Sequence, residues 1–168
     1  MDFSRLNYPR VVLGGIASLL LVISVLFLPW YDLDSNPQRE AGSPDFSPDS
    51  FICDEGEFSC TGFETFPILR WLLLAAALAP LILAWIIVRG HRLSWAPGEM
   101  TMVVGFTAFI LILYNGVIDR PGSQIAESGV GLDYGYWLAL LAAGLMAATG
   151  FLRSVESGDV KRKAPGTV

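Results

Sequence analysis

The chain has 168 residues, of which 53% are hydrophobic and 16% charged, and its mean hydropathy is +0.52. Soluble domains contain about 45–50% apolar and about 25% charged residues, so the composition indicates a membrane protein and argues against a soluble globular enzyme or a disordered chain. The formal net charge of −5 argues against nucleic-acid binding, because contact with a phosphate backbone requires clustered Lys and Arg.

Four long uncharged runs predict four membrane spans, because a helix needs about 20 predominantly apolar residues to cross a hydrocarbon core. The runs cover residues 11–30, 71–88, 100–118 and 134–152. Helices buried in a soluble protein are the alternative, but four such runs would leave too little polar surface to cover them. The first run exceeds the length of a secretory signal and has no small-residue cleavage site, so it is predicted to be a retained anchor. The predicted fold is an all-α membrane protein, an antiparallel four-helix transmembrane bundle that forms one domain over 1–168.

The termini and the segments between the spans carry all the charged residues, and they carry them asymmetrically. Eight of the 11 basic residues lie in the termini and the middle connection, whereas twelve of the 16 acidic residues lie in the other two connections. Basic flanks stay in the cytoplasm, which predicts a multi-pass protein of the plasma membrane, of bacterial cell-membrane type, with both termini cytoplasmic. The predicted segments are a first outer loop (31–67), an inner loop (89–99), a second outer loop (119–133) and a cytoplasmic tail (153–168).

Aromatic residues lie at the predicted span ends, where an amphipathic ring keeps its body in hydrocarbon and its polar edge in water. They are interpreted as membrane anchors, with an aromatic ligand cage as the alternative. Those at the outer ends are Trp30, Tyr31, Trp71, Tyr134, Tyr136 and Trp137.

The first outer loop holds both cysteines of the chain, Cys53 and Cys60. An even pair in an oxidising compartment favours a disulfide. A redox pair would favour a C-x-x-C spacing, and a zinc site would need further Cys or His ligands. A Ca²⁺ site made of nearby acidic residues is a further alternative, although their spacing does not match an EF-hand loop. Alternating aromatics over 51–66 predict a short β-hairpin or a compact turn that lies on the membrane surface.

Arg70 precedes the second span on the side that otherwise carries acidic residues. Its predicted partners in an ion pair that ties the loop to the bundle are Glu64, Asp119 and Asp133. The alternative is an arginine that extends to the lipid headgroups.

Small residues at helical spacing predict where the helices pack, because close approach supplies most of the contact between helices in lipid. The predicted seam comprises Thr101, Gly105, Ala108, Ile112 and Asn115 in the third span, Tyr136, Ala139, Ala143, Ala147 and Gly150 in the fourth, and Gly14, Ala17, Leu21 and Ser24 in the first.

Two resemblances follow from this plan. The run Leu-Pro-Trp-Tyr that closes the first span, the run Gly-Phe-Glu-Thr-Phe before the second, and the excess of Arg over Lys resemble uncharacterised small four-span proteins of actinobacteria, which carry no established activity. Trp30, the two loop cysteines and Arg70 together resemble the topology of claudin-type tetraspan proteins. Claudins place Gly-Leu-Trp before the first loop cysteine, where this chain has Asp49-Ser50-Phe51. The claudin resemblance implies a β-structured outer loop and lateral or cell–cell association.

The spans hold no ionisable side chain, whereas proton relays and ion paths are marked by such residues. The sequence therefore predicts a protein that is not an enzyme and uses no cofactor, metal or small-molecule substrate. Its predicted partners are the lipid bilayer and a membrane protein or further copies of itself, bound through the acidic outer loop. The alternative functions are a small oligomeric channel or transporter subunit lined by the third span and, less favoured, a lipid- or redox-handling enzyme that uses the cysteines.

Overall fold

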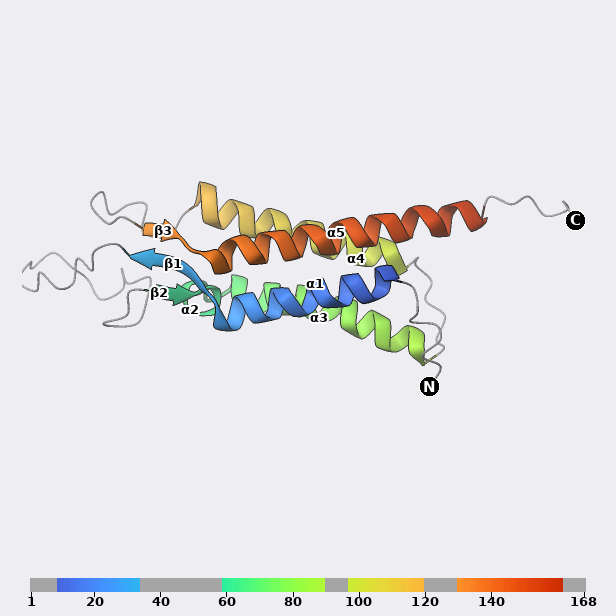
Figure 1. The fold of residues 1–168 in the computed structure, drawn as a ribbon, viewed down its shortest axis with the longest axis horizontal. Coiled ribbons are helices and arrows are strands. Elements are labelled where there is room, and N and C mark those ends of the chain that lie inside the picture. Colours follow the sequence, from blue (N-terminus) through green and yellow to red (C-terminus); the bar gives the residue numbers. More distant parts are fainter. Residues whose placement is uncertain (1–8, 34–58, 90–96, 120–129, 162–168) are drawn as a thin grey trace, which may run out of the picture.

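The computed structural model describes residues 9–33, 59–89, 97–119 and 130–161. Within these ranges the chain is mostly helical, with four long apolar helices and one small three-stranded sheet. The long helices run side by side, and the sheet lies at one end of them (Figure 1). They are α1 (Pro9–Phe27), α3 (Leu69–Val88), α4 (Pro97–Leu113) and α5 (Tyr134–Lys161). Each is long and apolar enough to cross a membrane. For α4, this length includes the π-helical turn that continues it.

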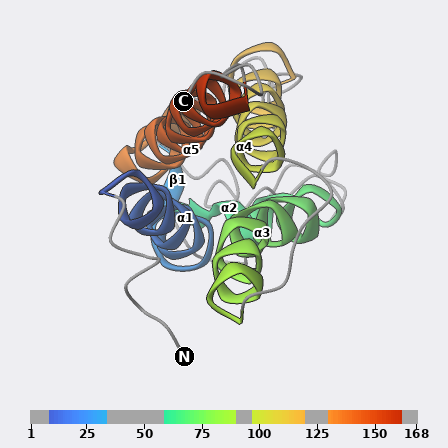
Figure 2. The ribbon, with the colours of Figure 1, turned by 90° about the vertical axis from the view of Figure 1, so that its right-hand side faces the viewer.

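The helices are arranged with α5 between α4 and α1, and with α1 between α5 and α3 (Figure 2). We call the end that carries the sheet the sheet end. The opposite end, where α1 begins and α5 finishes, is called the terminal end (Figure 1).

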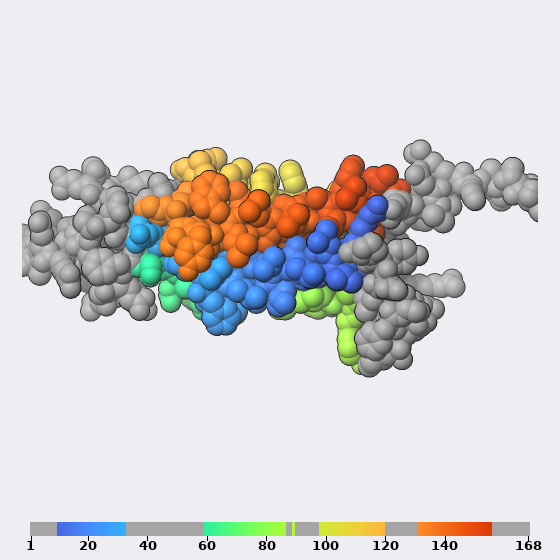
Figure 3. Space-filling view, in the orientation of Figure 1, coloured from blue at the N-terminus to red at the C-terminus, as the bar shows by residue number. Residues whose placement is uncertain are grey.

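The outward faces of the helices are apolar. The space-filling view shows α1 and α5 side by side on one face of the molecule (Figure 3). On these two helices Ile16, Leu19 and Leu141 are 50%, 53% and 64% exposed. Exposed apolar patches of this extent are rare on soluble monomers, and they suit a hydrocarbon environment.

Small residues allow α4 and α5 to approach closely. A Cβ atom on Gly105 would lie 2.5 Å from the backbone nitrogen of Ala147, so only glycine fits there without a shift of one helix. The other residues of the predicted seam that are buried are Gly14, Ala17, Leu21, Ser24, Thr101, Ala108, Ile112, Tyr136, Ala139, Ala143 and Gly150. Asn115 and Ala147 are half-buried.

One polar contact ties α1 to α3 in the interior. The hydroxyl of Ser18, which is fully buried, donates to the backbone carbonyl of Ala77. A hydroxyl left without a partner in apolar surroundings would be costly, so this contact favours one register of the two helices.

The helix ends differ from the predicted span ends. α1 stops at Phe27, three residues before the predicted end, because Pro29 lacks an amide donor and disfavours helical geometry at the residue before it. α5 continues to Lys161, beyond the predicted end at residue 152, because helical hydrogen bonding does not require apolar side chains. α4 passes into a π-helical turn, η4 (Tyr114–Ile118).

Of the hairpin predicted over 51–66, residues 51–58 lie outside the described residues, and the described part contributes one strand to a sheet with distant segments. Its order is β2-β1-β3, with the central strand β1 antiparallel to both neighbours. The strands are β1 (Pro29–Leu33), β2 (Ser59–Thr61) and β3 (Val130–Leu132), and a short helix, α2 (Gly62–Thr65), follows β2. The strand β2 therefore pairs with the segment that directly follows α1, and the second connection supplies the third strand.

Candidate functional site

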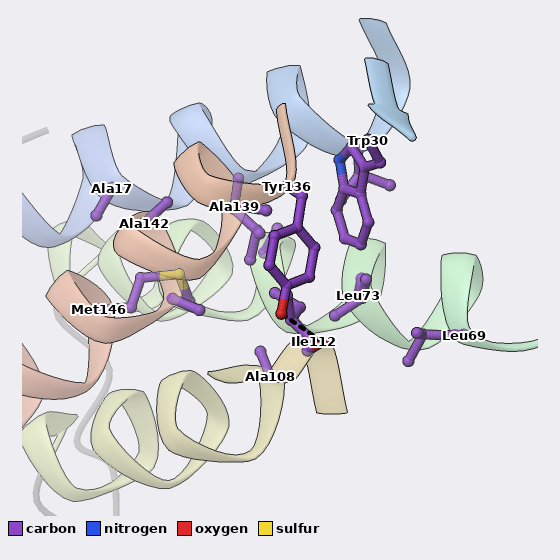
Figure 4. Packing of buried hydrophobic residues seen from close by; sticks show 14 of the residues in the cluster. Ala17, Trp30, Leu69, Leu73, Ala108, Ile112, Tyr136, Ala139, Ala142 and Met146 are labelled. Carbon is purple, nitrogen blue, oxygen red and sulfur yellow. Dashed lines mark hydrogen bonds between the residues drawn. The ribbon is translucent and has the colours of Figure 1, made fainter. Parts of the chain in front are cut away.

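An aromatic cluster fills the space between the sheet and the helix ends. Trp30, Tyr31 and Tyr136 have no exposed surface. The Trp30 ring meets Tyr136 and Phe66 edge-on, with centroid distances of 5.9 and 6.3 Å, and Tyr31 meets Phe66 at 6.0 Å. Figure 4 shows the rings of Trp30 and Tyr136 beside Leu73 of α3. The cluster therefore joins α1, β1, α3 and α5 into one packed unit.

A β-bulge explains how two consecutive residues of β1 are both buried. Pro29 pairs with Thr61 and Tyr31 pairs with Cys60, so Trp30 is the extra residue in the ladder. Successive strand side chains normally point to opposite faces of a sheet, and a bulge re-aims one of them. The bulge thus lets Trp30 and Tyr31 enter the same core.

Hydrogen bonds hold the Trp30 ring in position. Its Nε1 donates to the carbonyl oxygen of Ser24 at 3.0 Å and lies 3.2 Å from the Ser24 hydroxyl oxygen. That hydroxyl in turn donates to the carbonyl of Gly135 at 2.6 Å. The network links the last turn of α1 to the first turn of α5, and it satisfies buried polar groups that would otherwise be costly.

The two buried tyrosines contact the end of α4 and the π-helical turn η4 that follows it. The Tyr31 hydroxyl donates to the carbonyl of Asn115 at 3.4 Å. The Tyr136 hydroxyl donates to the carbonyl of Ile112, also at 3.4 Å (Figure 4). Gly116 lies directly against the Tyr136 ring, where a Cβ atom would overlap it. The carbonyl that accepts from Tyr31 therefore belongs to η4, and the one that accepts from Tyr136 belongs to the last turn of α4.

Helix α2 connects the sheet to α3 through a capping box. The hydroxyl of Thr61 accepts from the amide of Glu64 at 3.3 Å, and the Glu64 carboxylate accepts from the amide of Thr61 at 2.9 Å. Gly62, between them, faces the Trp30 ring, and a Cβ there would lie 2.6 Å from it. The short helix is therefore fixed both to the strand and to the aromatic cluster.

Arg70 lies beside this connection with its guanidinium over two rings. The guanidinium carbon is 4.7 Å from the Phe63 ring centroid and 5.6 Å from that of Trp71, and Nη1 donates to the Phe63 carbonyl at 3.3 Å. Its Nε is buried without a hydrogen-bond partner among the described residues. Stacking of an arginine on aromatic faces is favourable, and it holds the first turn of α3 against α2.

The three carboxylates predicted to pair with Arg70 have other positions. Glu64 closes the capping box, Asp133 accepts from the amide of Tyr134 at 2.6 Å, and Asp119 is exposed just after η4. None of them is among the contacts that the structure gives the Arg70 guanidinium within the described ranges. The predicted ion pair therefore remains a prediction.

The predicted disulfide involves one described residue. Cys60 is buried in β2 with 1% of its surface exposed, whereas Cys53 lies outside the described residues. Three acidic residues considered as a Ca²⁺ site also lie outside them: Asp54, Glu55 and Glu57. Within the described part of the chain, no group of three or more His, Cys, Asp or Glu residues could hold a metal ion.

The interpretation of the aromatic residues as membrane anchors is wrong for half of them. Trp71, Tyr134 and Trp137 are 60%, 58% and 51% exposed, as an anchor requires. The other three, Trp30, Tyr31 and Tyr136, form the buried cluster. Two residues in the sequence could have indicated that these side chains are buried. Pro29 ends the helix before Trp30, and Gly135 lets α5 approach β1 closely.

A comparison with known proteins finds no protein-family model, no curated protein and no solved structure that matches this chain. The two resemblances drawn from the sequence therefore remain predictions.

Proposed function

We propose that the chain is a four-span integral membrane protein without catalysis of its own, and that it acts as an accessory or partner-binding subunit of a membrane complex. The sheet end would face outward, and the acidic first outer loop would make the contact with the partner. The partner that suits this loop is a membrane protein with a basic external surface.

The observation that carries the proposal is the strand register at the edge of the sheet farthest from the helices. Asp32 pairs with Ser59, and Leu33 pairs with Val130. Segment 34–58 joins Leu33 to Ser59, and segment 120–129 ends at Val130, so both connections meet the fold at adjacent strand ends. A rigid scaffold that presents two connecting segments together is a common design of binding proteins.

Charge supports the proposed orientation. Segment 34–58 contains seven acidic residues and one basic residue. The terminal end, in contrast, carries Arg10 in α1, Arg89 after α3 and Arg153 in α5. Basic residues favour the cytoplasmic side, which would leave the acidic segment outside.

The alternative function, an oligomeric pore lined by the third span, receives less support. Its stripe of small residues would have to face a water-filled channel. In the monomer, Gly105 and Ala108 of this stripe are buried, with Gly105 directly against α5. The stripe is therefore occupied by contact within one chain.

The proposed function is tested by replacing the seven acidic residues of segment 34–58 with the corresponding amides. They are Asp34, Glu40, Asp45, Asp49, Asp54, Glu55 and Glu57. After mild solubilisation, native mass spectrometry should detect a hetero-complex of fixed stoichiometry for the wild type and only the free chain for the variant. The control, Glu99→Gln with Glu156→Gln at the terminal end, should retain the complex. A wild-type chain that emerges alone would contradict the proposal, and a homogeneous ring of copies would favour the pore.

We further propose that Cys60 and Cys53 form a disulfide within the outer loop. Because Cys60 is buried, thiol labelling has to be performed on denatured, unreduced protein. We expect no labelling before reduction and two labelled thiols after it. Reduction should lower the free energy of unfolding by about 2–3 kcal/mol, the chain-entropy contribution of so short a loop. A variant with both cysteines replaced by Ser serves as the control, because its stability should not respond to reductant. Labelling of two thiols without reduction would contradict the disulfide.

A further inference from the structure

Arg70, at the sheet end of the bundle, has a buried donor without an acceptor. Its Nε is buried and has no hydrogen-bond partner among the described residues. A buried donor without a partner is costly, so an acceptor from outside the chain is expected beside it. We propose that this acceptor is the phosphate of a phosphatidylethanolamine molecule in the leaflet at the sheet end, and that Glu64 binds the ammonium group of the same headgroup.

The contacts of Arg70 leave one edge of its guanidinium for a ligand. Stacking on Phe63 and Trp71 uses the flat face, and the Phe63 carbonyl uses Nη1. Nε and Nη2 form a second edge, and two parallel donors on one edge match two oxygens of a phosphate. The Trp71 ring is 60% exposed, so it can turn aside to admit an anion without disturbing the core.

The charge of the sheet end favours a headgroup without net charge. Among the described residues at this end, Arg70 is the only basic one, and the acidic ones are Asp32, Glu64, Asp119 and Asp133. These carboxylates would repel a lipid with a net negative charge, whereas a zwitterionic headgroup brings one cation for each phosphate. The charge pattern therefore favours phosphatidylethanolamine over phosphatidylglycerol.

Glu64 is placed to accept from the ammonium group. It is exposed and directly follows Phe63, which holds Arg70 through both its ring and its carbonyl. Glu64 Oε2 accepts from the Thr61 amide at 2.9 Å, which leaves most of the acceptor capacity of the carboxylate unused. Two carbons join the phosphate and the ammonium of this headgroup, so neighbouring side chains of opposite charge can bind both. Phosphatidylcholine would keep the contact with Arg70, but choline has no N–H donor for Glu64.

Apolar side chains near Arg70 favour a lipid over a soluble phosphate compound. Arg70 is the second residue of the apolar window of α3, which begins at Leu69, so it lies at the boundary between hydrocarbon and water. Ile68 and Leu72 are 76% and 52% exposed. The acyl chains of a bound lipid would lie along these side chains, which a soluble compound would leave uncovered.

Glu64→Gln separates the charge of Glu64 from its structural role. Glutamine also closes a capping box, so this variant should fold and keep α2 in place. Arg70→Gln removes the guanidinium. Arg89→Gln is the matched control, because Arg89 also stacks on a tryptophan, Trp85 at 4.8 Å, but lies at the terminal end. If Arg70→Gln lost its helical circular dichroism, the comparison of Glu64→Gln with the wild type would decide.

The experiment uses the purified full-length chain in detergent with phosphatidylethanolamine, phosphatidylcholine or phosphatidylglycerol of matched acyl chains, and native mass spectrometry counts the retained lipid. The wild type should retain phosphatidylethanolamine at least about tenfold better than either other lipid, the scale of one hydrogen bond between charged groups. Glu64→Gln should retain phosphatidylethanolamine and phosphatidylcholine equally, Arg70→Gln should retain both poorly, and Arg89→Gln should match the wild type. Equal retention of the three lipids by the wild type, a preference for phosphatidylglycerol, or a preference for phosphatidylethanolamine that survives in Glu64→Gln would overturn the proposal.

A second arm separates the lipid from a soluble source of the same chemistry. Glycerophosphoethanolamine has the same headgroup without acyl chains, and at millimolar concentration it should leave the retained lipid unchanged. Displacement of the lipid would assign the site to a soluble ligand and overturn the lipid assignment. The inference shares with the proposed function only the membrane-spanning arrangement of the helices. Because no partner protein is present in this experiment, its outcome is independent of whether the outer loop binds one.

Discussion

The substitution Gly105→Ala should destabilise the protein by about 2–3 kcal/mol, although it adds a single methyl group and improves helix propensity. The added Cβ would lie 2.5 Å from the Ala147 nitrogen and 2.9 Å from the carbonyl carbon of Met146. These are backbone atoms that cannot rotate away, so α4 and α5 would have to separate along their length. Separation would also weaken the contacts of Ala108, which is buried farther along α4.

Gly144→Ala is the matched control, because it makes the same chemical change on α5, where there is room. A Cβ at Gly144 would lie 3.6 Å from the Phe109 ring, an ordinary van der Waals distance. This variant should be as stable as the wild type or up to about 1 kcal/mol more stable, since alanine favours the helix. Unfolding in mild detergent, followed by far-ultraviolet circular dichroism, measures both. Equal stability of the two variants would contradict the close approach of α4 and α5.

The four long helices could be predicted because each depends on information local to its own segment. About 20 uncharged apolar residues in a row have few structural alternatives. The spacing of small residues also predicted which face of the first, third and fourth spans would lie inward, and Gly105, Ala139 and Ala143 are buried. These features depend on the period of the helix, which the sequence displays directly.

The sheet could not be predicted, because its strands are short and their partners lie far apart in the chain. β2 and β3 have three residues each, too few to display an alternating pattern. Their pairing with β1 depends on the helices, which bring the three segments to one end of the bundle. The prediction over 51–66 sought a partner strand among near neighbours, whereas the described partner of β2 is β1, which lies about 30 residues earlier in the chain.

The buried aromatic cluster was missed for a different physical reason. Trp and Tyr have an apolar body and one polar group, so they suit a membrane interface and a hydrogen-bonded core equally well. The ring is buried in the core rather than placed at the interface when the core offers a hydrogen-bond partner for its polar group. For Trp30 the partner is Ser24, and for Tyr136 it is the Ile112 carbonyl, which lies just before the π-helical turn η4.

The second large effect is expected for Trp30→Ala, which should destabilise the protein by about 3–5 kcal/mol. The substitution removes the ring that Tyr136 and Phe66 pack against and leaves a cavity below the sheet. It also leaves the Ser24 carbonyl without the Nε1 donor that it has now. Trp30→Phe should cost less, because a ring remains and only the hydrogen bond and part of the volume are lost.

Trp71→Ala separates this effect from the loss of any tryptophan at the same end. Trp71 is 60% exposed, so its removal should change the free energy of unfolding by less than about 1 kcal/mol. Unfolding in mild detergent ranks the variants, and hydrogen exchange locates the damage, which for Trp30→Ala should appear first in residues 59–66. If Trp30→Ala were no less stable than Trp71→Ala, the cluster would not be what holds the sheet on the helices. Contacts within the first outer loop, and not the aromatic cluster, would then have to hold the two outer segments in place.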